Sequence, residues 1–415
     1  MFIVLRNSWP LFLGMLLLML GNGLQGTLLG IRGAIEGFSP NTMAWVMSGY
    51  FIGFLGGSRM APEMIRRVGH VRVFAALASL VSAALILYAA LPNVIVWMLL
   101  RILIGFCFSG VYVVAESWLN DSATNETRGQ TLSLYVIVQM MGIVAAQGVL
   151  NFGDPAGYTL FIISSVLVSV SFAPILLSIS PAPLFQTTKP MSFKRLYKVS
   201  PTAVVGIFLL GTIFSALFGM TSVYGTEKGL DVSSITILVA MIYIGGMVCQ
   251  YPIGWASDRM DRRLLIIYLT VFGTIVMVGA PLLANNLYSL MFILFVVGGV
   301  SNPLYSLYLA YMNDYLEPDD MAAASGGLIF ISGLGAIGGP FVVGWMMTNF
   351  GANSFFIFLA VILGLSASWT IFRSTVREAP DVADTGAYAH ISPGTSVVAV
   401  ELAAEVAIDM AEEEA

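Results

Sequence analysis

Two charged side chains stand inside a long apolar stretch, where charge is costly. Arg101 and Glu116 both lie in the run from Val94 to Trp118. Charged groups inside a bilayer need a partner or a water-filled cavity, and they often mark ion and substrate pathways. Because desolvation favours the protonated form of a carboxylic acid, Glu116 is a candidate proton carrier. Arg101 lies about 22 Å away along a helix, so the two side chains cannot pair directly.

Each charge also has a purely structural alternative. Glu116 can pair with a loop arginine such as Arg128. Arg32 and Glu36 are four residues apart, so they can form an ordinary ion pair at the membrane surface. These alternatives stay open on the sequence alone.

Amides, hydroxyls and tyrosines form a second group that could bind a solute. They fall on single faces of four apolar segments, since residues three or four apart share one face of a helix. Such side chains also tie membrane helices together, so packing is the alternative reading. The predicted cavity residues are Asn22, Gln25, Arg32, Tyr112, Thr212, Ser215, Asn302 and Tyr305.

Catalytic and metal-binding patterns do not occur in the apolar segments. The only histidines are His70 and His390, and the only cysteines are Cys107 and Cys249. There is no nucleophile–base pair, no metal-ligand spacing and no G-x-x-x-x-G-K phosphate loop. We therefore expect no enzyme activity, no cofactor, no metal and no disulfide. The absence of a basic stripe also excludes nucleic acid as a partner.

The elements that carry these residues are apolar and long. Hydrophobic residues make up 58% of the chain and charged residues 10%, against roughly 25% charged residues in soluble proteins. A spanning helix needs about 20 apolar residues. The sequence predicts an all-α membrane protein with twelve such spans: Trp9–Ile31, Asn41–Ala61, Val71–Leu91, Val94–Trp118, Thr131–Leu150, Tyr158–Ile179, Thr202–Tyr224, Ser233–Ser257, Leu264–Ala284, Leu287–Met312, Ala322–Asn349 and Ser354–Phe372.

Basic residues predict the orientation. With a cytoplasmic N-terminus, fifteen Lys and Arg fall on the inner side and two, Arg32 and Lys228, on the outer side. Cytoplasmic loops carry such an excess of basic residues. We expect both termini in the cytoplasm and a multi-pass location in the inner (plasma) membrane.

A weak internal repeat divides the chain in two. Tyr112 corresponds to Tyr305 at a constant offset, and Asn120-Asp121 corresponds to Asn313-Asp314. Two parallel repeats of six helices suit a transporter that rocks about a central site. The predicted domains are an N-terminal six-helix bundle (1–180), a cytoplasmic linker (181–200), a C-terminal six-helix bundle (201–375) and an acidic, disordered cytoplasmic tail (376–415).

One loop resembles a family motif. Residues 254–263 read Gly-Trp-Ala-Ser-Asp-Arg-Met-Asp-Arg-Arg, which is similar to the G-x-x-x-D-R-x-x-R-R loop of the major facilitator superfamily. The resemblance implies a cytoplasmic gate made of Gly254, Asp258, Arg259, Arg262 and Arg263. Arg66 and Arg67, at the end of the N-terminal copy, are predicted to belong to the same gate, but Pro62 stands where the aspartate of that copy would be.

Two further segments bear on the family. Arg101-x-x-x-Gly105 resembles the family's second motif, which ties that arginine to proton coupling. Residues 116–120, Glu-Ser-Trp-Leu-Asn, resemble an uncharacterised YcaD-like bacterial branch. The Gly-Pro-rich fifth helix of drug antiporters is missing, which weakens an efflux reading.

The sequence therefore predicts a secondary active transporter. It would move a small organic solute by alternating access, coupled to protons, as a monomer in the lipid bilayer. Efflux of amphipathic compounds by antiport is one alternative, and a transport-inactive sensor or interaction protein is the other.

Overall fold

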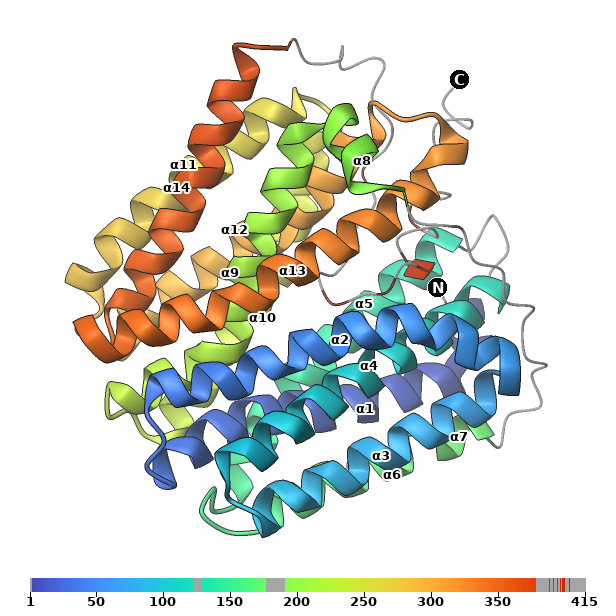
Figure 1. The fold of residues 1–415 in the computed structure, drawn as a ribbon, viewed down its shortest axis with the longest axis vertical. Helices are drawn as coiled ribbons and strands as arrows, with labels where there is room; N and C mark the ends of the chain where they lie inside the picture. Colours follow the sequence, from blue (N-terminus) through green and yellow to red (C-terminus); the bar gives the residue numbers. More distant parts are fainter. Residues whose placement is uncertain are drawn as a thin grey trace.

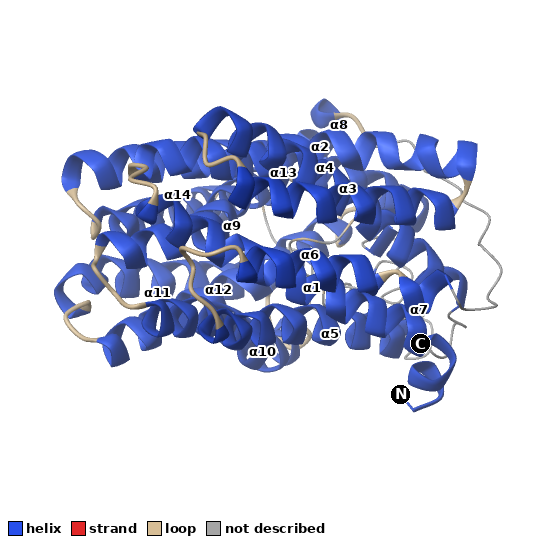
Figure 2. Cartoon of the chain, turned by 90° about the horizontal axis from the view of Figure 1, so that it is seen from below, coloured by secondary structure: helices blue, strands red, loops and turns tan. Residues whose placement is uncertain are grey.

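The chain is helical throughout the part that the structure describes. The structure is a computed structural model, and it describes residues 2–122, 128–176 and 191–377 with seven single positions after them: 388, 391, 394, 396, 398, 399 and 403. No strand occurs among these residues (Figure 2). The predicted all-α class is confirmed. The predicted linker and tail lie largely outside the described residues, so the domain division stays a prediction.

Helices from the first part of the chain pack into one group, which we call the N-terminal half. Helix α2 packs along α4, α1 along α5 and α6, and α3 along α4 and α6 (Figure 1). The elements are α1 (Phe2–Ile35), α2 (Pro40–Val68), α3 (His70–Ala90), α4 (Val94–Ser122), α5 (Arg128–Val149), the 3-10 turn η1 (Leu150–Phe152), α6 (Thr159–Ser171) and α7 (Ala173–Leu176).

A second group, the C-terminal half, follows the short helix α8 (Phe193–Val199). In this half α9 packs along α13, α10 along α12, and α11 along α14. The elements are α9 (Pro201–Glu227), α10 (Val232–Ser257), α11 (Arg262–Leu283), α12 (Leu287–Asn313), α13 (Pro318–Phe350) and α14 (Ser354–Ser374).

Glycines let equivalent helices approach closely in the two halves. A Cβ on Gly53 of α2 would collide with the carbonyl oxygen of Ile102 on α4. In the same way, a Cβ on Gly245 of α10 would collide with the carbonyl oxygen of Phe295 on α12. Small residues permit such backbone contact between membrane helices. The internal repeat of the sequence thus corresponds to a repeated packing geometry.

A serine followed by a proline starts one helix in each half, at positions that are not equivalent in the repeat. Ser39 Oγ accepts a hydrogen bond from the Thr42 amide at 3.2 Å, and Ser200 Oγ accepts one from the Ala203 amide at 3.4 Å. A proline follows each serine, at a position where a helix has no use for its amide hydrogen. These local signals begin α2 and α9.

Ten described helical segments are long and apolar enough to cross a membrane. They correspond to ten of the twelve predicted spans. The predicted span Asn41–Ala61 is the helix α2, which is 29 residues long but is not one of the ten. The predicted span Tyr158–Ile179 is interrupted: α6 has 13 residues, and α7 begins after Phe172. The structure therefore shows a multi-pass helical membrane protein, without a confirmed count of twelve.

Contacts between the halves gather toward one end of the helices. The Asn41 amide donates to Thr348 Oγ1 at 3.2 Å, and the rings of Trp45 and Phe341 lie 4.4 Å apart. We call this end, which also holds the α1–α2 and α9–α10 loops, the closed end. The other end, which holds the α2–α3 and α10–α11 loops, carries most arginines, and we call it the basic end. In Figure 1 the halves approach on the left and diverge to the right.

Candidate solute-binding cavity

A cavity of about 180 Å³ lies between the two halves. This volume is on the scale of one aromatic ring with a small substituent, since an engineered protein cavity of about 150 Å³ accepts benzene. Helices α1, α2, α4 and α5 line it from one half, and α9, α10, α12 and α13 line it from the other. A site shared by both halves can be reshaped by any movement of one half against the other.

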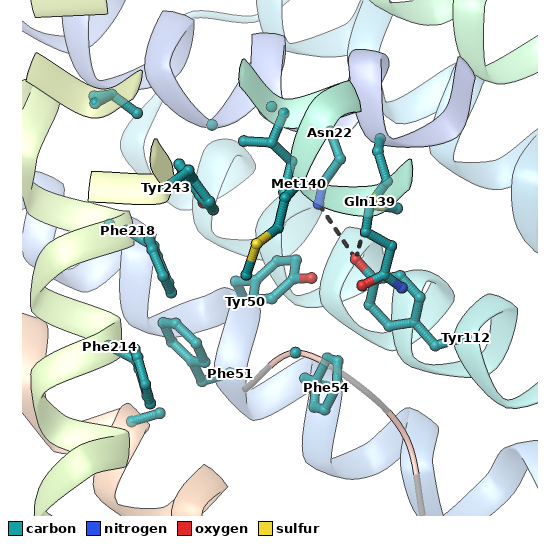
Figure 3. Close-up of a pocket in the computed structure, with 18 of the residues that line it drawn as sticks. Asn22, Tyr50, Phe51, Phe54, Tyr112, Gln139, Met140, Phe214, Phe218 and Tyr243 are labelled. Atoms are coloured by element: carbon teal, nitrogen blue, oxygen red, sulfur yellow. Dashed lines mark hydrogen bonds between the residues drawn. The ribbon is translucent and has the colours of Figure 1, made fainter. Parts of the chain in front are cut away.

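Polar side chains line the wall from the N-terminal half. Arg101 Nη1 donates to Gln25 Oε1 at 2.8 Å, and Gln25 Nε2 donates to Asn22 Oδ1 at 3.2 Å. Asn22 Nδ2 points toward the Tyr112 hydroxyl at 3.5 Å (Figure 3). The guanidinium also lies over the Tyr50 ring, 5.0 Å from its centroid. Arg101 is thus held in place by neutral groups.

Two donors on this wall have no hydrogen-bond partner. They are Arg101 Nε and Gln139 Nε2, and both side chains are buried. Among the described residues, Arg101 has no ion pair with a carboxylate. A buried donor left without a partner is costly. The wall is therefore suited to a ligand that brings acceptor oxygens or negative charge.

Aromatic rings line the wall from the C-terminal half. The Phe214 and Phe218 rings are stacked, with centroids 5.6 Å apart and planes at 8°. Phe218 and Tyr243 continue the stack at 4.9 Å and 16°. Figure 3 shows these three rings on the side of the cavity opposite Asn22 and Gln139. Flat rings pack well against another flat, apolar surface.

Glu116 is buried beside the cavity and is not among its lining residues. The Tyr135 hydroxyl donates to Glu116 Oε1 at 2.9 Å. The Ser396 amide donates to Oε2 at 2.9 Å, and the Ser396 hydroxyl donates to the same oxygen. The proposed alternative partner, Arg128, has a side chain outside the described part of the chain. Glu116 is therefore held by neutral donors, one of them from the tail.

The loop between α10 and α11 places four predicted gate residues at the basic end. Asp258 Oδ1 lies 3.7 Å from Arg262 Nη2, and Arg262 Nη1 also pairs with Asp314. Arg263 Nε donates to the Tyr311 hydroxyl at 3.2 Å. Arg259 lies over the ring of Trp255, 4.5 Å from its centroid. The fifth gate residue, Gly254, is buried near the end of α10.

The tail contacts this loop. The Tyr388 amide donates to Asp258 Oδ1 at 2.9 Å, and its ring would touch any Cβ placed on Gly254. Burial raises the pKa of the Tyr388 phenol above its ordinary value. The carboxylate of Asp258 thus accepts a hydrogen bond from the backbone of the tail.

The matching loop of the N-terminal half is exposed. Arg66 and Arg67 both pair with Glu63, at 2.6 Å and 2.7 Å. The hydrogen bond from Arg67 holds the pKa of the Glu63 carboxyl below its usual range. Surface pairs of this kind contribute little to stability. The two loops therefore differ in structure as they differ in sequence.

Six of the ten predicted cavity and coupling residues line the cavity: Asn22, Gln25, Arg101, Tyr112, Asn302 and Tyr305. Thr212 Oγ1 instead donates to the Gly335 carbonyl at 3.1 Å, and Ser215 Oγ donates to the Thr212 carbonyl at 3.0 Å. Arg32 pairs with Glu36 at 2.7 Å near the closed end. These three are not among the lining residues and instead bond to neighbouring backbone or side chains. With Glu116 described above, all ten residues are placed.

Sequence reasoning missed much of the lining. Gln139 and Gln147 from α5 line the cavity, and their spacing of eight residues puts them on one helix face. That spacing could have identified them. The aromatic wall carried no such signal, because a ring in an apolar span can also face lipid.

Comparisons with known proteins add to this geometry. A family model described as Major Facilitator Superfamily matches residues 11–249 and 204–403. An Escherichia fergusonii protein named as the uncharacterized MFS-type transporter YcaD is 26% identical over 368 residues, which cover 87% of this chain and 94% of that protein. The Bacillus subtilis protein named as the uncharacterized MFS-type transporter YfkF is 26% identical over 384 residues, which cover 88% and 97%.

Solved transporter structures share the fold. A structure of a mutant of the nucleoside transporter NupG matches with a TM-score of 0.76 and 14% identity, over 88% of this chain and 99% of that one. A bacterial homolog of the human lysosomal transporter Spinster, in an inward-facing and occupied conformation, matches with a TM-score of 0.72 and 13% identity, over 92% and 98%.

Proposed function

We propose that this chain, which belongs to the Major Facilitator Superfamily, is a secondary active transporter that moves a small organic solute by alternating access. The family resemblance inferred from the gate loop is confirmed by the family match and by the YcaD-type relatives. Members of this family are transporters, so the chain is not an enzyme. The substrate, the coupling ion and the transport cycle belong to the proposal.

The observation that carries the proposal is the buried guanidinium in a cavity shared by both halves. Arg101 sits at the cavity wall with Nε free of any hydrogen-bond partner. A buried cation without a carboxylate partner is costly unless a ligand or water completes its surroundings. A protein that only senses or scaffolds would gain little from keeping this charge between its halves.

The two walls suggest the class of solute. Free donors on one side favour a carboxylate or another strong acceptor. The stacked rings on the other side favour a planar, apolar group. We infer a small organic solute that combines a ring with an anionic or acceptor-rich group. The nucleosides named for NupG also combine a ring with polar groups, so they belong in the first solute panel.

The same aromatic wall also fits the alternative function, efflux of amphipathic compounds. An apolar, ring-lined surface also suits amphipathic compounds, and antiport would export them. The direction of proton movement separates the two functions. In symport, protons move with the solute, whereas in antiport they move against it.

Proton coupling is proposed for Glu116, with Arg101 in the same helix. Glu116 is buried and its described contacts are all with neutral groups. A carboxyl group in such surroundings can gain and lose a proton as a movement of the halves changes its donors and its access to water.

Topology and location complete the proposal. We place twelve spans in the plasma membrane of a bacterium, with the basic end and both termini in the cytoplasm. The excess of arginine at the basic end supports this orientation. We also propose that the protein acts as a monomer.

Proton movement in sealed proteoliposomes tests the function. A trapped pH-sensitive dye would report flux when a panel of ring-bearing acids, their uncharged amides and nucleosides is added outside. We expect flux with at least one ring-bearing acid, and loss of its pH dependence in Glu116→Gln. Glu36→Gln, which alters the ion pair at the closed end, should keep the pH dependence.

Three other outcomes would change the conclusion. A pH dependence that persists in Glu116→Gln would remove that residue from proton coupling. Solute exchange without proton flux would indicate a uniporter. If neither proton flux nor exchange of radiolabelled solute occurs for any member of the panel, the result favours the transport-inactive alternative.

A further inference from the structure

Described positions of the C-terminal segment lie between the two halves. Ile391, Ala399 and Ala403 are buried and belong to the same apolar cluster as the helices. Gly394 lines the central cavity itself. The described positions from 388 to 403 therefore lie where the halves diverge.

One anchor of this segment is Glu116 on α4, in the N-terminal half. Its carboxylate accepts the amide of Ser396 at 2.9 Å, the hydroxyl of Ser396, and the amide of Ala399 at 3.3 Å. The Val398 amide in turn donates to Ser396 Oγ at 3.2 Å. Backbone amides that converge on a buried carboxylate form strong, charge-assisted hydrogen bonds.

The other anchors lie on α10 and α12, in the C-terminal half. Ser306 Oγ accepts the Ile391 amide at 3.0 Å and is placed to donate to the Ile391 carbonyl at 3.1 Å. Asp258 accepts the Tyr388 amide, and Gln250 donates to the Tyr388 hydroxyl. The segment is thus hydrogen-bonded to both halves.

Charge favours approach of the tail as a whole to the basic end. Nine of the 23 acidic residues follow Thr375, and no Lys or Arg follows Arg377. The basic end carries the exposed residues Arg66, Arg67 and Arg259, which attract an acidic chain before any specific contact forms. Only Glu401 of the nine lies between positions 388 and 403, so the docking itself is argued from the hydrogen bonds and the burial.

We propose that Glu116, Ser306 and Asp258 form a peptide-binding site for the chain's own C-terminal segment, which they contact at the described positions Tyr388, Ile391, Ser396 and Ala399. When bound, the segment holds the halves apart at the basic end and covers the approach to the cavity from that side. For the halves to close there, the segment has to leave. It therefore favours the conformation that is closed at the other end.

A bound segment that prevents closure at the basic end would inhibit transport. That inhibition rests on the proposed transport function, whereas the docking of the segment does not. The docking is measurable without any solute, in the full-length chain. In a background of Cys107→Ala and Cys249→Ala, a single Ala399→Cys reports burial of the segment by its rate of modification with a water-soluble maleimide. The same chain unfolded in detergent gives the rate of a freely accessible thiol.

We expect modification in the folded chain to be at least tenfold slower than in the unfolded chain. Ser396→Pro removes both the amide and the hydroxyl that Glu116 accepts, so it should raise the rate at least tenfold. Ser301→Ala is the matched control, because Ser301 lies on α12 near Ser306 and its buried hydroxyl has no partner. That variant should leave the rate unchanged.

A fast rate in the folded parent chain would overturn the docking, and so would a slow rate that Ser396→Pro leaves unchanged. The conformational effect has a separate readout. Spin labels at Val68 and Leu264 report the distance between the halves at the basic end. Ser396→Pro should add a population with a shorter distance. An unaltered distance distribution would overturn the proposal that the segment holds the halves apart, while leaving the docking intact.

Discussion

At the scale of single residues, the cavity divides its chemistry between the two halves. The donors without a partner, on Arg101 and Gln139, lie in the N-terminal half, and the three stacked rings lie in the C-terminal half. Arg101 is the only cationic side chain among the described lining residues. We therefore expect the selectivity for polar groups of the solute to depend on contacts to Arg101 and Gln139.

Substitution of Arg101 should weaken solute binding. Hydrogen bonds to charged groups contribute about 1.5–3 kcal/mol, so Arg101→Gln should lower the affinity for an anionic solute about ten- to a hundredfold. Arg101→Lys should lower the affinity by a smaller factor, because lysine keeps the charge but lacks the planar guanidinium that can donate two parallel hydrogen bonds. Binding is measured by counterflow of the solute found in the liposome screen.

The control for this pair is Arg72→Gln, which alters an exposed arginine at the basic end. It should leave the affinity unchanged. Equal affinity in Arg101→Gln and the parent protein would exclude Arg101 from the binding site.

The sequence predicted part of this site for a clear physical reason. An amide or arginine in an apolar run is costly, so Asn22, Gln25 and Arg101 could be identified without a structure. Phe218 and Tyr243 could not, because a ring facing a cavity and a ring facing lipid look the same in sequence. The contact of Glu116 with Ser396 spans 280 residues, and no local pattern predicts such a pairing.

At the scale of helices, close approach between α2 and α4 depends on glycine. A Cβ on Gly53 would collide with the backbone of Ile102, whereas one on Gly56 would make only an ordinary contact, 3.7 Å from the ring of Phe106. The two glycines are three residues apart on the same helix, so they form a matched pair.

Gly53→Ala should lower the stability of the N-terminal half. Overpacking of a tight contact costs about 1–3 kcal/mol, which should lower the thermal unfolding midpoint of the purified protein. Gly56→Ala should leave that midpoint unchanged. If both variants unfold like the parent protein, the helices have room to separate and the proposed contact is not tight.

The helices themselves were well predicted, since runs of about 20 apolar residues have few alternatives in a bilayer. The exceptions were α2 and α6. Gly, Ser and charged residues make α2 less apolar than the other spans. This helix packs along α4. The break after α6 falls at Phe172, two residues before Pro174. Proline is common just after the end of a helix, so this break had a local signal that the predicted span did not use.

At the scale of the whole molecule, alternating access requires the closed end to open. Asn41 and Thr348 are joined there by a hydrogen bond of 3.2 Å. We propose the pair Asn41→Cys and Thr348→Cys in a background without native cysteines. Oxidation to the disulfide should stop transport, and reduction should restore it. Solute exchange in proteoliposomes measures both states.

The matched control is a disulfide within one half. Ser82 on α3 and Ser165 on α6 have hydroxyl oxygens 2.7 Å apart. Ser82→Cys with Ser165→Cys should cross-link without stopping transport, because both helices belong to the N-terminal half. Full transport in the oxidised Asn41–Thr348 pair would mean that the halves do not separate at that end.

The composition of the cavity wall has a spectroscopic consequence. The chain contains seven tryptophans, but none is among the described lining residues, which include Tyr50, Tyr112, Tyr243 and Tyr305. A solute that enters the cavity would meet tyrosine and phenylalanine chromophores and no indole. Intrinsic indole fluorescence would then stay nearly constant on binding, and an indole placed at Phe218 would turn occupancy of the cavity into an optical signal.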